Sequence, residues 1–241
     1  GTQEKIYITA ISNGTTVSQD GIVVATLSAG QSFQANLSNA STYIVASNPV
    51  YVYQISGIGC ELGGAILPPV KCTGSLAATY TRSSSRANYL NVLVRAGGES
   101  FFRVNGSSSV ITATNFTPVP GSANQWLSAS ILLSNSISAL DAPVTITNSR
   151  TFFHLGVLIG NDREGTAFGF FSSFNNNYAN ASTKTPLICD GGRIELFADT
   201  LLTATYQWVG PNNFTSNQQN PVITNASVLS AGKYYLTVSL P

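Results

Sequence analysis

Short runs of β-branched and aromatic residues recur along the whole chain and constrain its fold more than any other feature. They include residues 5–11, 21–27, 50–55, 89–94 and 152–159. Turn-forming pairs such as Asn-Gly and Asn-Pro separate these runs. No segment has the sustained apolar repeat of 3.6 residues, with caps at its ends, that an amphipathic helix requires. The sequence therefore predicts an all-β chain.

The runs before residue 180 are numerous enough for a large two-sheet sandwich of the jelly-roll kind. The segment 174–186 is polar and ends in Pro186, so we interpret it as a linker or a long closing loop. We therefore expect a large β-sandwich over residues 1–184 and a smaller domain over residues 185–241.

The C-terminal region contains a Trp and a Tyr at an informative spacing. Trp208 precedes a Gly-Lys-Tyr triplet that ends at Tyr234. This is the arrangement of an immunoglobulin-like sandwich, in which the Trp fills the core and the Tyr makes a corner before the penultimate strand. Antibody domains have a disulfide where this chain has Leu196 and Leu236, so we expect an apolar contact instead. The predicted core of the small sandwich contains Leu196, Trp208, Tyr234 and Leu236.

The composition indicates an uncharged polar surface. Charged residues make up 9% of the chain and the net charge is +1, whereas about 25% is usual for soluble domains. Hydroxyl and amide groups suit an extracellular protein that contacts glycans or other surfaces, where salt screens charge. Without clustered Lys and Arg, nucleic acid is not an expected partner. No run approaches the roughly 20 apolar residues of a membrane helix, so we expect no membrane insertion.

Two of the three cysteines are expected to form a bridge. Cys60 and Cys72 flank a segment rich in Gly and Pro, which would otherwise be a flexible loop. Closing a loop of this size stabilises by about 3 kcal/mol in the chain-entropy model. The alternative is a pair of buried free thiols in a reduced compartment. Cys189 is left over, and an odd cysteine in an exported protein indicates a partner elsewhere.

Candidate catalytic and metal-binding residues are sparse. The chain has ten carboxylates and one His, whereas catalysis needs a nucleophile, a base and an orienting group in one cleft. We therefore expect no enzyme activity, and we interpret His154 as a satisfied strand residue. Asp162 and Glu164 could provide oxygen ligands for Ca²⁺. Arg163 between them favours instead a hairpin tip with neutralised charge. No cofactor is expected.

Tyr51 and Tyr53 are the candidate ligand-binding residues. Together with Tyr80 and Tyr89, they could form a flat aromatic platform for sugar rings. Tyr51 and Tyr53 share one face of a strand, because residues two apart lie on the same side. Packing in a half-buried core explains the same pattern, and we favour it.

Two parts of the chain resemble known families. The first resembles the N-terminal domain of the IgG Fc-binding protein family, as found in large surface proteins of Bacteroidetes, over about residues 1–180. Its most specific part is the stretch Cys-Glu-x-Gly-x-Ala-Ile-Leu-Pro-Pro at residues 60–69. The other segments that carry the resemblance are residues 48–54, 153–157 and 169–174.

The second resemblance covers the C-terminal region. Residues 185–192 and 206–216 are similar to the small immunoglobulin-like or PKD-like repeats of bacterial cell-surface adhesins, including gliding-motility adhesins. Such repeats often pair an early cysteine with one just after the last strand. The resemblance therefore implies a partner for Cys189 that lies outside this chain.

Together, the two resemblances imply a fragment of a longer exported adhesin, but they supply no binding residue by motif. We expect a non-catalytic module of a secreted bacterial adhesin that attaches to surfaces or glycans beside further immunoglobulin-like modules. A second hypothesis is a structural subunit that assembles with copies of itself into an extracellular filament or sheath through open sheet edges or strand donation. A third is an accessory domain of an exported hydrolase.

Overall fold

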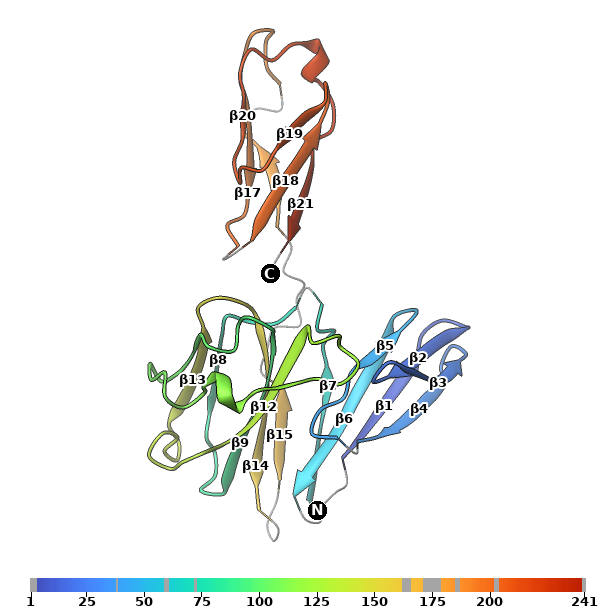
Figure 1. Cartoon of the computed structure of the whole chain (residues 1–241), viewed down its shortest axis with the longest axis vertical. Coiled ribbons are helices and arrows are strands. Elements are labelled where there is room, and N and C mark those ends of the chain that lie inside the picture. Colours follow the sequence, from blue (N-terminus) through green and yellow to red (C-terminus); the bar gives the residue numbers. More distant parts are fainter. Residues whose placement is uncertain are drawn as a thin grey trace. The chain divides into compact units, whose positions relative to one another are not determined.

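Nearly all regular structure in this protein is β. The computed structural model describes residues 4–37, 39–58, 61–71, 73–161, 166–170, 179–184, 187–201 and 204–239. The chain divides into two compact units, residues 1–176 and 177–241, hereafter unit 1 and unit 2 (Figure 1). The prediction of an all-β chain built from sandwiches is confirmed. Of the described residues, none forms a helix long and apolar enough to cross a membrane.

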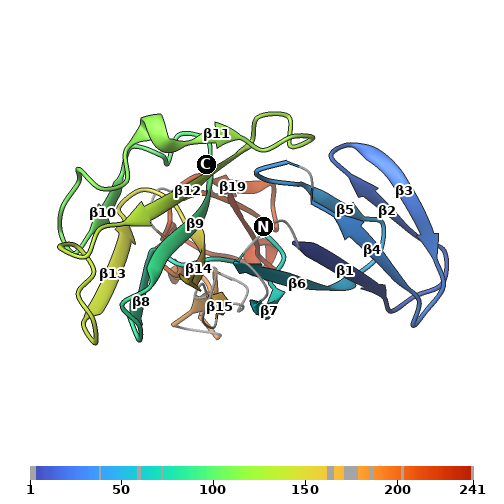
Figure 2. The same cartoon turned by 90° about the horizontal axis from the view of Figure 1, so that it is seen from below.

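The first half of unit 1 is a sandwich of two antiparallel sheets, with strand orders β4-β1-β6-β7 and β3-β2-β5 (Figure 2). Because successive side chains of a strand point to opposite faces, Ile6, Ile8 and Ala10 of β1 all face inward. They form a core with Val17 and Leu27 from the other sheet. The strands are β1 (Lys5–Ala10), β2 (Thr15–Gln19), β3 (Ile22–Leu27), β4 (Ser32–Asn36), β5 (Ile44–Ala46), β6 (Val50–Ile58) and β7 (Glu61–Leu67).

The second half of unit 1 is another sandwich, with strand orders β10-β13-β8 and β11-β12-β9-β14-β15. Phe102 and Phe153 meet edge to face in its core, with 5.2 Å between ring centroids. The elements are β8 (Ala77–Thr81), β9 (Ala87–Arg95), β10 (Phe102–Val104), the 3₁₀ turn η1 (Ala113–Asn115), β11 (Thr117–Pro118), β12 (Trp126–Leu133), β13 (Pro143–Asn148), β14 (Phe153–Gly160) and β15 (Ala167–Phe170).

The two sandwiches of unit 1 meet where β7 lies beside β15. A Cβ atom on Gly63 would lie 2.8 Å from both the backbone nitrogen and the Cβ of Phe168, so only glycine permits this approach. The region expected to form one large sandwich thus contains two separate cores. Alternation defines the inner face of each strand, but long-range pairing decides which strands share a core.

Unit 2 is a small sandwich with strand orders β16-β17-β20 and β19-β18-β21. Trp208 is 1% exposed and Leu196 is buried beside it, while Tyr234 and Leu236 pack against this core. The Tyr234 hydroxyl donates to the carbonyl of Ser230 over 2.8 Å, which is a tyrosine corner. The elements are β16 (Ala181–Thr183), β17 (Ile194–Ala198), β18 (Thr205–Gly210), β19 (Phe214–Ser216), β20 (Val222–Ile223), η2 (Val228–Ser230) and β21 (Tyr235–Ser239).

The strand β16 belongs to unit 2, because its residues pair with β17 from Ala181 opposite Ala198 to Thr183 opposite Leu196. The boundary expected at residue 184 therefore falls inside unit 2. The composition of Ala-Ser-Thr in a polar segment conceals this strand, since small polar residues are as common in linkers as at sheet edges.

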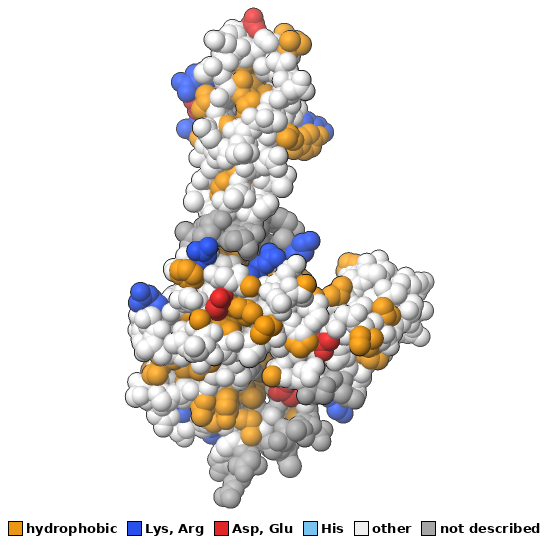
Figure 3. All heavy atoms as spheres, in the orientation of Figure 1, with side chains coloured by type: hydrophobic (Ala, Val, Ile, Leu, Met, Phe, Trp, Pro, Cys, Tyr) orange, Lys and Arg blue, Asp and Glu red, His pale blue; other side chains and the backbone are white. Residues whose placement is uncertain are grey.

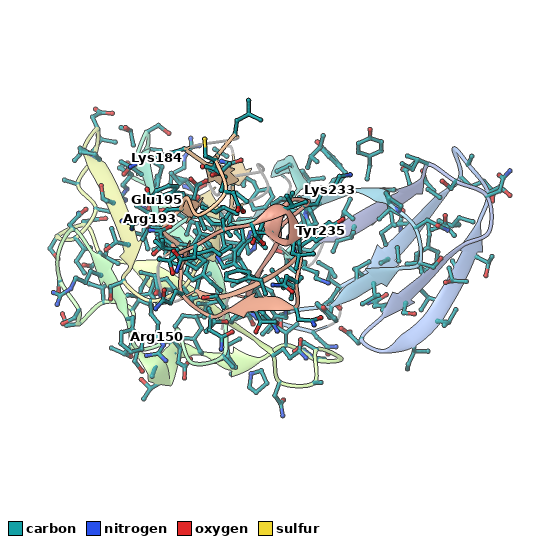
Figure 4. The ribbon with its side chains drawn as sticks, turned by 90° about the horizontal axis from the view of Figure 1, so that it is seen from above. Arg150, Lys184, Arg193, Glu195, Lys233 and Tyr235 are labelled. Atoms are coloured by element: carbon teal, nitrogen blue, oxygen red, sulfur yellow. The ribbon has the colours of Figure 1, made fainter. Side chains whose placement is uncertain are left out.

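Charged side chains of unit 2 gather on the outer face of β17. Arg193 and Glu195 form an ion pair with 3.4 Å between Nη2 and Oε1, and Lys184 Nζ lies 4.8 Å from the centre of the Phe197 ring (Figure 4). Exposed pairs of this kind contribute little to stability.

Candidate binding surface

Tyr51 and Tyr53 lie on the outer face of the sheet β4-β1-β6-β7, away from the core. Val50 and Val52, which alternate with them on β6, pack against the core instead. Tyr51 is 64% exposed and Tyr53 is 41% exposed. The core packing favoured above is therefore wrong for these two residues, and their rings are available to a ligand.

The sheet register brings further apolar side chains to the same face. Tyr7 of β1 lies directly opposite Tyr53, and Ile66 of β7 lies opposite Tyr53 on its other side. Leu62 shares the face of Ile66 by alternation, and both are at least half exposed. We call the set of Tyr7, Tyr51, Tyr53, Leu62 and Ile66 the tyrosine face.

Gly64 fixes the orientation of Tyr53 on this face. A Cβ atom built on Gly64 would lie 2.5 Å from Cζ and 2.8 Å from Cε1 of Tyr53, so the ring lies across the strand β7 at this glycine. The glycine therefore leaves room for the hydroxyl end of the Tyr53 ring against β7, while Tyr53 as a whole remains 41% exposed. A ring held flat in this way is pre-organised for stacking, because binding costs it little conformational entropy.

The segment 61–67 was expected to be a loop between two cysteines, and this expectation is wrong. It forms β7, which pairs with β6 from Val52 opposite Leu67 to Ile58 opposite Glu61. Its two glycines serve close contacts rather than turns, since Gly63 admits β15 and Gly64 admits the Tyr53 ring. Alternation of Leu62, Gly64 and Ile66 is the sequence signal that could have revealed this strand and its outer face.

The chemistry of the tyrosine face suits a weakly polar ligand with flat apolar patches. Among the described residues, neither the Tyr51 nor the Tyr53 hydroxyl has a hydrogen-bond partner, so both are free to bond a ligand. A tyrosine offers apolar ring area together with one polar group. Lys5, which shares this face of β1 with Tyr7 by alternation, adds one charged group beside it. On the side of the chain that Figure 3 shows, Lys, Arg, Asp and Glu side chains are scattered and do not form one large patch.

Several residues predicted as sites are not joined into one. Cys60, Cys72, Asp162 and Glu164 lie outside the described residues, so the bridge and the Ca²⁺ ligands remain predictions. Cys189 is an exposed free thiol. Within the described parts of the chain, no three His, Cys, Asp or Glu side chains form a group that could hold a metal ion.

His154 lies in β14 and is 1% exposed. Its ring centroid is 6.0 Å from that of Trp126, and a Cβ on Gly74 would lie 3.4 Å from its Cε1. Burial lowers the pKa of His154 to about 4, although a hydrogen bond with the Val70 backbone acts in the opposite direction. The imidazole is therefore neutral at physiological pH, and it is enclosed rather than presented to a substrate.

Comparison with known proteins identifies the family. The sequence profile of the IgGFc binding protein family matches residues 1–154, which is more than half of the chain and includes the tyrosine face. This chain belongs to the IgGFc-binding protein family. The family is one of extracellular binding modules. The comparison indicates no catalytic family for this chain. The family match ends within β14, so it covers the first sandwich and most of the second.

Other comparisons add little to the family match. No curated protein matches the chain. A solved structure of an amphioxus IgVJ-C2 molecule is 14% identical, with a TM-score of 0.24, over 68% of this chain and 88% of that one.

Proposed function

We propose that this member of the IgGFc-binding family is a non-catalytic module of a secreted bacterial cell-surface adhesin and binds surface polysaccharide through the tyrosine face. The exposure of Tyr51 and Tyr53 on an outer sheet face, with Tyr53 held flat at Gly64, carries the proposal. Sugar rings present apolar C–H faces to aromatic rings and hydroxyls to their rims, which matches this surface. Unit 2 connects this module to further immunoglobulin-like modules of the adhesin.

Replacing both Tyr51 and Tyr53 with alanine is expected to weaken polysaccharide binding about tenfold or more, because buried aromatic residues dominate most binding interfaces. Affinity electrophoresis in gels that contain neutral or acidic soluble polysaccharides measures this loss. Tyr235→Ala is the matched control, since Tyr235 is 62% exposed but belongs to unit 2. If the double variant is retarded as strongly as the unsubstituted chain, the tyrosine face is not the binding surface.

Gly64→Val provides an independent test of the same surface. A valine side chain would displace the Tyr53 ring from its place across β7, while both tyrosines remain present. Binding should fall as it does in a Tyr53→Ala variant. Retained binding with a displaced ring, seen as a changed Tyr53 ring signal in NMR spectra, would show that the flat orientation is irrelevant.

The second candidate function, assembly into a filament or sheath, is favoured by the free edge of β3. This strand ends the sheet β3-β2-β5, and Ile22, Val23 and Val24 are 71%, 64% and 37% exposed. Natural edge strands are usually protected by charged residues, proline or β-bulges. β3 contains no charged residue and no proline, and its one irregularity is a bulge at Val24, where the pairing with β2 shifts between Val17 and Ser18. A strand from another copy could therefore add to this edge.

Val23→Lys is expected to abolish any concentration-dependent polymerisation, because a charge on an edge strand opposes strand addition. Sedimentation velocity at low and high salt measures the size distribution. Polymers of the unsubstituted chain should persist at high salt, since no ion pair is involved. Val209→Lys, which places the same change at an exposed position of unit 2, should polymerise normally. A chain that stays monomeric at every concentration excludes assembly.

A further inference from the structure

Arg82 is a fully buried cation at one end of the second sandwich of unit 1. It directly follows β8 and is 2% exposed. Its Nε donates to the carbonyl of Ser84 over 2.8 Å, and Nη2 donates to the carbonyl of Arg86 over 2.7 Å. Nη1 donates to Oδ1 of Asn135 over 2.8 Å and to the carbonyl of Ser138. The guanidinium thus holds together the loop after β8 and the loop after β12.

All of these acceptors are neutral. Among the described residues, Arg82 forms no ion pair with a carboxylate. An arginine side chain keeps its positive charge in proteins, so the guanidinium of Arg82 is a charged group in a buried position. A buried charge is costly unless it is paired, and carbonyl dipoles offset only part of that cost. In the part of the chain that the structure describes, no negative charge neutralises this guanidinium.

An open surface pocket of about 250 Å³ lies beside this cation. It is lined by Arg82, Ser85, Asn135, Ala139 and Leu140. Ser85 and Leu140 are exposed at its rim, so the pocket communicates with solvent. Nη2 carries two hydrogens and has one acceptor among the described residues, which leaves one donor for a ligand. Ser85 and Asn135 provide further hydrogen-bonding groups.

We propose that this pocket is an anion site that binds one carboxylate group, carried by an acidic sugar. A carboxylate supplies the single negative charge that the guanidinium lacks, and it accepts hydrogen bonds in the plane of the guanidinium. The pocket is smaller than those of drug-sized ligands, so it suits one sugar residue. The apolar side chains of Ala139 and Leu140 would contact the sugar ring. This site is separate from the tyrosine face and does not depend on its function.

Thermal unfolding of the full chain in the presence of small probes tests the proposal. Sodium glucuronate at about ten times its dissociation constant should raise the unfolding midpoint of unit 1 by about 3–6 °C. Sodium acetate should give a smaller rise at the same concentration, and glucose and sodium chloride should give none. An equal response to acetate and glucuronate would show that no sugar is recognised. No response to either carboxylate, or an equal response to chloride, overturns the site itself.

Ser85→Glu separates binding from general stabilisation without removing Arg82. A glutamate at the rim would supply the missing charge from within the chain, so the midpoint should rise and the response to glucuronate should be lost. Ser130→Glu is the matched control, because it adds the same charge at an exposed position of β12 and should respond as the unsubstituted chain does. A Ser85→Glu variant that still responds fully to glucuronate overturns the proposal.

Discussion

Replacing Trp208 with alanine is expected to destabilise unit 2 by about 3–5 kcal/mol, the usual cost of deleting a large buried aromatic side chain. Trp208 is 1% exposed, lies directly opposite Leu236, and donates from Nε1 to the carbonyl of Gln219 over 3.2 Å. Its removal therefore leaves a cavity and an unpaired carbonyl. A unit of this size has a total stability of only roughly 3–10 kcal/mol, so most of it would be lost.

Differential scanning calorimetry measures this effect, because the two units have separate cores. The transition of unit 2 should shift by more than about 12 °C or disappear, while the transition of unit 1 stays in place. Tyr235→Ala, on the exposed face of β21, should leave both transitions unchanged. A shift of only a few degrees in Trp208→Ala would mean that the strand pairing, rather than this side chain, holds unit 2 together.

Unit 1 is expected to lose about 3 kcal/mol of stability between pH 7 and pH 4 through His154 alone. Burial lowers the pKa of His154 from 6.5 to about 4 in the folded chain, whereas the unfolded chain keeps the ordinary pKa of about 6.5. As the pH falls below about 6.5, His154 binds a proton in the unfolded state but stays neutral in the folded state. Stability is therefore intact above the unfolded pKa and falls until the pH reaches the folded pKa.

Urea unfolding of unit 1 at a series of pH values measures this loss. A tenfold difference in proton affinity corresponds to about 1.4 kcal/mol, and the profile should be steepest, at nearly one proton, around pH 5. His154→Gln removes the titrating group and keeps a polar side chain of similar size. The variant should show a much flatter profile around this pH. If its profile is as steep as that of the unsubstituted chain, other groups cause the acid sensitivity.

Local patterns were sufficient to predict the core of unit 2, although not its first strand, β16. The spacing of Trp208 and Tyr234 led to the small sandwich, because a buried Trp and a tyrosine corner depend on residues close together in sequence. The structure also explains Gly210, which follows Trp208 by two residues on β18. A side chain on Gly210 would overlap the Tyr234 ring, and so the corner requires glycine there. The apolar contact of Trp208 with Leu236 occupies the position of a disulfide in antibody domains.

Contacts between distant segments were not predictable in the same way. The glycines of 61–67 were interpreted as loop residues, because glycine is common in turns. Their strand conformation depends on β15 and on Tyr53, which approach only in the folded chain. The exposure of Tyr51 and Tyr53 likewise depends on how distant segments pack in the folded chain. Alternation places two residues on one face of a strand, but it does not say whether another sheet covers that face.

Composition and short-range periodicity were enough to indicate the all-β class, the immunoglobulin-like arrangement of unit 2 and a chain without the charge patterns that nucleic acid requires. The two cores of unit 1, the solvent-facing tyrosines and the burial of Arg82 beside an open pocket could be seen only in the folded chain. These features depend on which strands pair across long stretches of chain. Pairing of that kind is set by the packing of the whole sheet rather than by any local pattern.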